Sequence, residues 1–447
     1  MATTLVASNA GAIPGSLRHP GAARFWLAVC LIGMSTGCGA AALTLLLEAV
    51  QHTAWRGSPS NILEAATHAS VPRHVVVLIA AGILTGAGQL LLKQLSSGNG
   101  IDTTAAIWFF AGRMPALRTL GSAVLSILVV GMGASMGREG APKQAGAVFA
   151  NLFADVEALS DEERRLLVAC GAGAGMSAAY GVPLGGAIFA LEVMRGKLAL
   201  RFVLPALFTS LIATAVSWLA LPNAPTYDIP VFPLSASVLF WALLAAPVAA
   251  AASIFYVRAV RWADRNKPSS WQRFVAPTVV LGSLGVVSVW YPQILGNGRD
   301  LSQLLFTNQA APRLFLALFF LKPLATMLCM RSGIPGGLFT PSLTFGALLG
   351  AILGHAWSWL WPGVPPGLFA LLGAGAVLAA TTQGPISAVV LMMELTGQAR
   401  SFLPPLLLIA CISTLISRSI EHRSIYDARL TDEQIRERLR LRESPSA

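Results

Sequence analysis

Three short patterns occur twice in this chain, in the same order, and each second copy follows the first by about 200 residues. They are GNGxD, a glycine five residues before a proline, and GAGA followed by a proline and then a glutamate. The paired copies begin at Gly98 and Gly296, at Gly137 and Gly336, and at Gly171 and Gly373. Three ordered matches at nearly constant spacing indicate a duplicated half. Paired segments interrupted by glycine or proline are typical of transporters whose solute site lies between two repeats.

The composition restricts this duplicated chain to the membrane. Apolar residues make up 55% of the 447 residues and charged residues 11%, whereas a soluble domain carries about 25% charged residues. Several apolar segments are also shorter than the roughly 20 residues of a perpendicular helical crossing. A helix that stops within the bilayer is tolerated only inside protein or beside a water-filled cavity. The sequence therefore predicts an all-α polytopic membrane protein with tilted and re-entrant helices around a cavity.

Basic residues outside the apolar segments predict the orientation. Lysines and arginines cluster near the N-terminus, between 258 and 273, and near the C-terminus, but are missing from 222–234. Loops rich in these residues stay in the cytoplasm. With the linker outside, the two repeats are expected to be inverted. The expected divisions are a cytoplasmic N-terminal segment 1–24, a first membrane repeat 25–221, an external linker 222–234, a second membrane repeat 235–420 and a basic cytoplasmic tail 421–447.

Other classes of function find little support in the sequence. The five cysteines form no CxxC pair and the six histidines show no metal-ligand spacing, so neither a metal nor a cofactor is expected. No Ser/His, Cys/His or HExxH arrangement indicates an intramembrane enzyme, although a non-transporting scaffold stays an alternative. The net charge of +11 lies outside the apolar segments and is heavy in the tail, which favours a cytoplasmic tail over a nucleic-acid surface.

The segment 137–142 has the chemistry of a gated anion site. Gly137 and Gly140 let the backbone approach a ligand, and Pro142 suits the first turn of a helix. The N–H groups at such a helix start favour an anion, with Arg138 beside them. Glu139 would compete with that anion when ionised and release the site when protonated. An exposed ion pair of Arg138 with a neighbour is the alternative, but ionisable groups at membrane depth are usually functional.

The repeat supplies further helix starts. Residues 332–341 again place glycines before a helix, with Gly337, Leu338 and Phe339 at its expected beginning. Two such starts from opposite halves can converge on one small anion. The GNG turn offers a third start with Asn99 as a side-chain donor, although a plain surface turn explains GNG equally well.

Two further acids occupy matching positions in the repeats. Glu192 and Glu394 each lie nine residues after a proline, late in an apolar segment. For Glu192, a proton relay and a salt bridge with Arg195 or Lys197 are both open. Glu394 has no basic neighbour nearby in the sequence, which favours a structural role.

These segments, in this order, resemble the CLC family of chloride channels and chloride/proton antiporters. The specific signals are GREGAP at 137–142 and GIPGGLFTP at 333–341, and the similarity extends from about residue 30 to 428. The stretch 381–397 and the later Ser-Ile-Tyr at 424–426 are similar to bacterial ClcB-type members. The resemblance implies an inner-membrane homodimer with one anion pathway per subunit, built from inverted repeats, that moves chloride or other small anions.

The resemblance also assigns roles to individual residues. Glu139 matches the external gating glutamate of the family. The backbone amides of Leu338 and Phe339 match those that hold the central anion, and Tyr426 matches the tyrosine whose hydroxyl contacts it. Asn99 falls where many members carry a serine.

One departure from the family concerns protons. Proton-coupled members carry two adjacent glutamates after the first-half proline, and the second one relays protons from the cytoplasm. Here these positions are Glu192 and Val193. The resemblance therefore implies a passive channel or a weakly coupled exchanger, with Glu192 as the candidate internal proton site. A fluoride-selective CLC antiporter is the alternative, although Ala141 does not match the threonine usual in that branch.

Overall fold

The computed structural model describes residues 22–56, 61–96, 101–157, 159–232, 234–398 and 402–443. Regular structure in these ranges is helical, apart from one isolated antiparallel bridge. The first half contains α1 (Ala22–Trp55), α2 (Ile62–Thr67), α3 (Val71–Leu95), α4 (Thr103–Phe109), α5 (Ala116–Gly131), α6 (Gly140–Val156), α7 (Asp161–Tyr180), α8 (Pro183–Phe189), the π-helical turn η2 (Ala190–Arg195) and α9 (Leu200–Ser217). The second half contains α10 (Ala236–Arg265), α11 (Gln272–Val287), η3 (Pro292–Ile294), α12 (Arg299–Phe306), η4 (Pro312–Leu314), α13 (Phe315–Arg331), α14 (Phe339–Leu360), α15 (Pro366–Thr382), α16 (Pro385–Thr396) and α17 (Leu403–Ile420), followed by α18 (Asp432–Glu443).

Seven of the described helical segments are long and apolar enough to cross a membrane. They comprise α1, α3, α9, α10, α13 with the turn before it, α14 and α17. Shorter apolar helices lie among them, at α5, α11, α15 and α16. The prediction of an all-α polytopic membrane protein that mixes full-length and short helices is confirmed.

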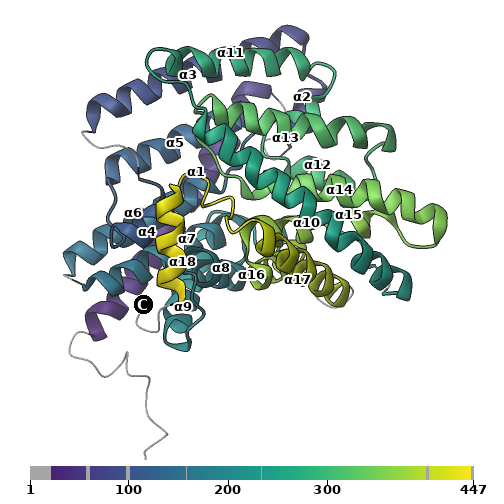
Figure 1. Cartoon of the computed structure of the whole chain (residues 1–447). Helices are drawn as coiled ribbons and strands as arrows, with labels where there is room; N and C mark the ends of the chain where they lie inside the picture. Colours follow the sequence, from purple (N-terminus) through teal and green to yellow (C-terminus); the bar gives the residue numbers. More distant parts are fainter. Residues whose placement is uncertain are drawn as a thin grey trace, which may run out of the picture.

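Each half contains the same tightly packed helix pair. In the first half α6 crosses α7, and in the second half α14 crosses α15 (Figure 1). A Cβ added to Gly146 would lie 2.0 Å from the carbonyl oxygen of Gly171, and one added to Gly346 would lie 2.5 Å from that of Gly373. Small residues let helix backbones approach this closely within membranes. The duplicated GAGA pattern therefore marks two equivalent helix crossings.

Each of these pairs is followed by a short helix in a new direction. Gly181 follows the last residue of α7 and Gln383 follows the last residue of α15, and both adopt left-handed backbone conformations, with φ of 68° and 56°. Pro183 and Pro385 then occupy the first position of α8 and α16, where a proline costs no hydrogen bond. The two halves thus share this turn, a left-handed residue followed closely by a proline that begins the next helix.

Candidate anion pathway

The two glycine-rich segments meet in the middle of the molecule. The Gly137 N–H donates to the Gly337 carbonyl at 2.8 Å, and the Gly337 N–H donates to the Gly137 carbonyl at 2.7 Å. A Cβ on Gly140 would lie 3.0 Å from the Gly337 nitrogen, so this approach needs glycine. The N-termini of α6 and α14 therefore lie beside each other, as the repeat predicted.

The Glu139 side chain occupies the N-terminus of α14. Its carboxylate is buried and its Oε1 accepts a hydrogen bond of 2.7 Å from the Phe339 N–H and a longer one of 3.4 Å from the Thr340 N–H. Its Oε2 accepts from the Thr340 hydroxyl at 3.0 Å and from the Tyr180 hydroxyl at 3.4 Å. An anion at a helix N-terminus is stabilised by unpaired N–H groups and by the helix dipole. The carboxylate thus fills a site that would also suit a small anion.

Glycine makes room for this carboxylate. A Cβ on Gly137 would lie 2.0 Å from Glu139 Oε1, and a Cβ on Gly337 would lie 2.2 Å from the same atom. Both glycines thus belong to the walls around the acid, and their role in binding an anion stays a prediction.

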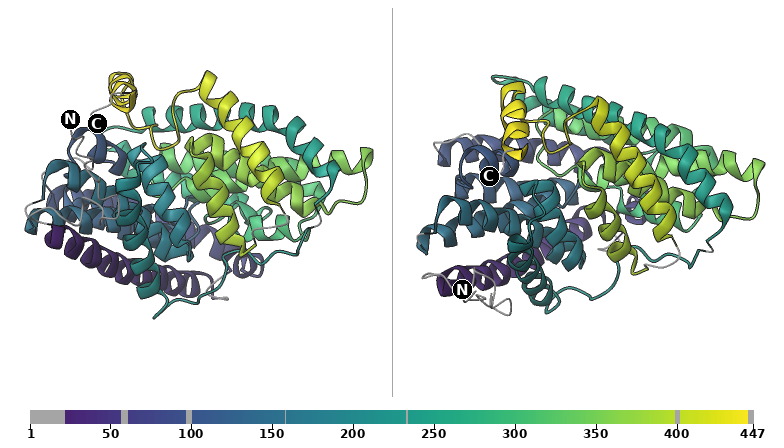
Figure 2. Two further views of the ribbon diagram at one scale, coloured as in Figure 1. Left: turned by 90° about the horizontal axis from the view of Figure 1, so that it is seen from below. Right: turned by 60° about the horizontal axis from the view of Figure 1, so that its bottom comes forward.

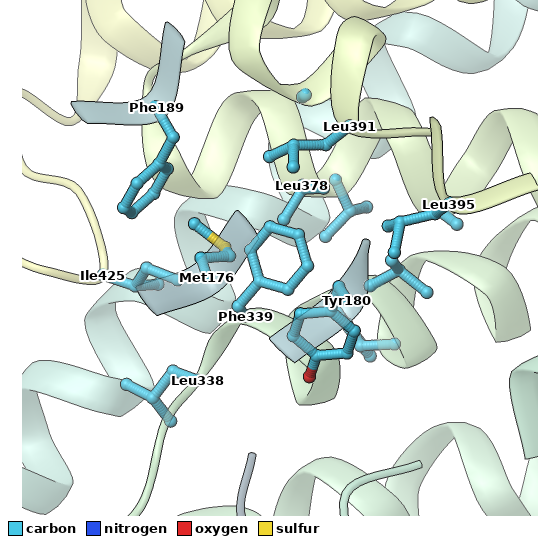
Figure 3. Close-up of a cluster of buried hydrophobic side chains, with 14 of the residues drawn as sticks. Met176, Tyr180, Phe189, Leu338, Phe339, Leu378, Leu391, Leu395 and Ile425 are labelled. Atoms are coloured by element: carbon cyan, nitrogen blue, oxygen red, sulfur yellow. The ribbon is translucent and has the colours of Figure 1, made fainter. Parts of the chain in front are cut away.

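Two hydroxyl groups at this site were not expected from the sequence. Tyr180 ends α7, and its hydroxyl lies 3.0 Å from that of Thr340. The guanidinium of Arg138 lies 4.8 Å from the centre of the Tyr180 ring. Figure 3 shows Phe339 between Met176 and Tyr180. Thr340 directly follows Phe339, so the sequence could have indicated it. Tyr180 belongs to another helix, and no local sequence pattern marks it.

Tyr426 and Leu338 line a small cavity beside the two glycine-rich helix starts. A cavity of about 80 Å³ is lined by Gly140, Gly337, Leu338 and Tyr426, among other residues. The Tyr426 ring packs edge-on against Phe189, with 5.5 Å between ring centres. The structure thus brings the predicted Tyr426 to the same passage as the glycine-rich helix starts.

The loop that carries Tyr426 is fixed by buried charges. Asp427 accepts hydrogen bonds from the Ser424 N–H at 2.9 Å and the Ser424 hydroxyl at 2.8 Å, and it forms an ion pair with Arg438 of α18. Both partners of this pair are almost fully buried. The Arg438 guanidinium also lies 4.9 Å from the centre of the Trp108 ring and donates to the Val193 carbonyl at 3.3 Å. Figure 2 shows α18, in yellow, lying along one surface of the helical body.

Each of the two matching acids contacts the start of a short helix in the opposite half of the protein. Glu192 accepts from the Ile386 N–H at 3.3 Å and the Ser387 N–H at 2.6 Å, at the start of α16. Glu394 accepts from the N–H groups of Leu184 at 3.0 Å and Gly185 at 2.6 Å, at the start of α8. Each acid therefore satisfies the helix start of the opposite half, as a capping residue does.

The expected alternative of a salt bridge from Glu192 to Arg195 or Lys197 is not found among the described residues. Arg195 pairs with Glu162 instead, and the Glu192 carboxylate accepts from the start of α16. Val193, the next residue, is buried. Whether Glu192 carries protons stays a prediction. Asn99 and the rest of its GNG turn lie outside the described residues, so its role also stays a prediction. Within the described ranges, no group of three or more His, Cys, Asp or Glu side chains could hold a metal ion.

Sequence comparisons agree with this geometry. The family model described as voltage gated chloride channel matches residues 82–418. A voltage-gated ClC-type chloride channel, ClcB of Citrobacter koseri, is 28% identical over 413 residues, which cover 90% of this chain and 97% of that protein. An H(+)/Cl(-) exchange transporter, ClcA of Yersinia pestis bv. Antiqua, is 31% identical over 312 residues, which cover 67% of this chain and 65% of that protein.

Solved structures share the fold. A slow cyanobacterial Cl-/H+ antiporter superposes with a TM-score of 0.79 at 21% identity, covering 91% of this chain and 96% of that one. A CLC-type fluoride/proton antiporter gives a TM-score of 0.73 at 22% identity, covering 91% and 97%. The glycine-rich helix starts meet, the glutamate between them lies on the Phe339 amide, and the family match spans most of the chain. This protein therefore belongs to the CLC family of voltage-gated chloride channels and transporters, and is similar to its bacterial ClcB-type members.

Proposed function

We propose that this protein carries chloride and other small anions across a bacterial inner membrane, with both termini in the cytoplasm. The observation that carries the proposal is the Glu139 carboxylate on the Phe339 N–H at 2.7 Å. A site that holds a carboxylate with backbone and hydroxyl donors, and that lies between two helix starts, has the donors a halide needs. The proposed partners are the anion, protons at Glu139, membrane lipid and, from the resemblance, a second copy of the chain.

Glu139 is the proposed gate. When ionised, its carboxylate occupies the N–H groups of Phe339 and Thr340 and excludes an anion from them. Protonation removes the negative charge that these donors and the α14 dipole stabilise, so the side chain leaves and an anion takes its place. Anion flow therefore rises as the pH falls.

Chloride release from liposomes tests the proposal directly. We expect purified protein to release chloride once a potassium ionophore balances the charge, and to release fluoride more slowly from the same vesicles. Fluoride export is the second candidate, because one of the similar structures is a fluoride/proton antiporter. Faster fluoride than chloride release would establish that alternative, and release of neither ion above protein-free vesicles would overturn the proposed function.

A passive or weakly coupled pathway is the proposed mode. Val193 cannot bind a proton and is buried, and its carbonyl accepts a hydrogen bond from the Arg438 guanidinium, which is itself paired with Asp427. No titratable side chain therefore occupies the position of the usual internal proton relay.

The reversal potential distinguishes the two modes. We expect it to stay at the chloride equilibrium potential when a proton gradient is imposed across a planar bilayer. A displacement toward the proton equilibrium potential would instead show exchange. Repeating the measurement with Glu192→Gln would then show whether that acid carries the protons.

A further inference from the structure

A lysine lies in the wall of the small cavity that Leu338 and Tyr426 line. Lys143 lies in the first turn of α6, and its ammonium is 4.3 Å from the centre of the Tyr426 ring. The side chain lines the cavity of about 80 Å³ together with Gly337, Leu338 and Tyr426. This lysine was not singled out from the sequence, where it simply follows Pro142.

Lys143 forms no ion pair with any described residue. Asp102, which lines the same cavity, is itself paired with Arg429 at 3.3 Å. The face of the Tyr426 ring supports the ammonium through a cation–π contact, which leaves its N–H groups able to meet an anion. When protonated, the Lys143 ammonium thus places a positive charge in the wall of this cavity.

The small cavity borders a wider basic cavity, which we call the vestibule. A second cavity of about 410 Å³ shares part of its wall with the small one, namely Asp102, Ser122, Gln144, Met330, Pro335 and Arg429. Its wall carries more basic than acidic side chains. The basic ones are Arg118, Lys267, Arg273 and Arg429, and the acidic ones are Asp102 and Asp264. Positive charge lining a cleft with low-dielectric walls concentrates anions there.

The acids of the vestibule are already neutralised. Asp264 forms an ion pair with Lys267 and lies 3.6 Å from the Arg429 guanidinium. Burial lowers the pKa of the Lys267 ammonium and Arg429 lowers it further, whereas Asp264 raises it. Because 258–273 is the basic loop expected in the cytoplasm, the vestibule is the proposed cytoplasmic opening of the pathway.

We propose that Lys143 is an anion-binding residue of its own, which holds a small monovalent anion at the cytoplasmic end of the passage before the anion reaches the helix starts. This proposal rests on the proposed function. Helix N-termini offer only partial charges, equivalent to about half an elementary charge each, whereas the ammonium adds a whole one. Lys143 therefore raises the affinity of the pathway for anions that arrive from the vestibule.

The test compares Lys143→Met with Lys143→Arg in planar bilayers with chloride varied on one side at a time. We expect Lys143→Met to raise the half-saturating chloride concentration on the vestibule side about tenfold, as expected when one favourable charge contact is lost. The value on the opposite side stays unchanged. Lys143→Arg keeps the charge and should stay within about twofold of the parent.

Lys197→Met is the matched control, because it removes the same charge outside the walls of both cavities. If Lys143→Met does not fold, Lys143→Gln carries the same test with a polar side chain. Parent-like half-saturation in the uncharged variants, or an equal loss in Lys143→Arg, overturns the assignment of Lys143 alone. A parent protein that passes no chloride overturns the proposed function, and this inference with it.

Discussion

Liposomes that contain Glu139→Ala should release chloride at the same rate at acidic and at neutral pH. The Glu139 carboxylate accepts hydrogen bonds from the Phe339 N–H and the Thr340 hydroxyl, and a hydrogen bond to a charged group contributes about 1.5–3 kcal/mol. Losing a competitor held by about 2 kcal/mol raises the apparent affinity of the site for an anion about 30-fold at neutral pH. The variant should therefore run at neutral pH as fast as the parent runs in acid.

Two further variants sharpen this test. Glu139→Gln keeps the size of the side chain without its charge, so it should also lose the pH dependence. Glu433→Gln removes an exposed carboxylate from α18 and should behave like the parent. If Glu139→Ala still accelerates on acidification as the parent does, Glu139 is not the gate.

Arg438→Gln should lower the thermal stability of the protein and weaken chloride binding together. The substitution leaves Asp427 buried without its ion-pair partner, and breaking a buried pair in this way costs about 3–5 kcal/mol. Because Asp427 adjoins Tyr426, the loop that lines the small cavity would lose its anchor. Thermal unfolding in detergent and the half-saturating chloride concentration measure the two effects.

A double-mutant cycle separates the pair from general damage. Asp427→Asn together with Arg438→Gln removes both charges, so it should be more stable than the sum of the two single losses predicts. Arg436→Gln changes an exposed arginine on the same helix and should leave both measurements near the parent values. Additive losses in the cycle would show that the ion pair does not hold the loop.

Much of the site was open to prediction because the chain is duplicated. The segments 137–142 and 332–341 lie far apart in the sequence, yet their matching places in the two repeats indicated that these helix starts would meet. The repeat also indicated that Glu192 and Glu394 are equivalent. It did not indicate that each acid would cap a helix of the other half, because a capping contact depends on how the halves pack and not on neighbours in the chain.

The packing of the C-terminal tail, by contrast, could not be predicted from the sequence. Its arginines predicted a cytoplasmic segment, and charge alone gave no reason to expect α18 to pack on the body. Arg438 packs there because Asp427, Trp108 and the Val193 carbonyl converge on one buried position. Because these three partners come from three separate segments, no periodicity or spacing in the sequence indicates the contact.

Sequence alone determined the membrane environment, the helical class, the duplicated halves and the acid at the centre, because hydropathy, glycine and proline are read locally. Tertiary structure decided the rest. The Glu139 carboxylate meets the Tyr180 hydroxyl, and Lys143 faces Tyr426, only because helices from different parts of the chain cross there. Such contacts depend on packing across long sequence separations, and no single segment encodes them.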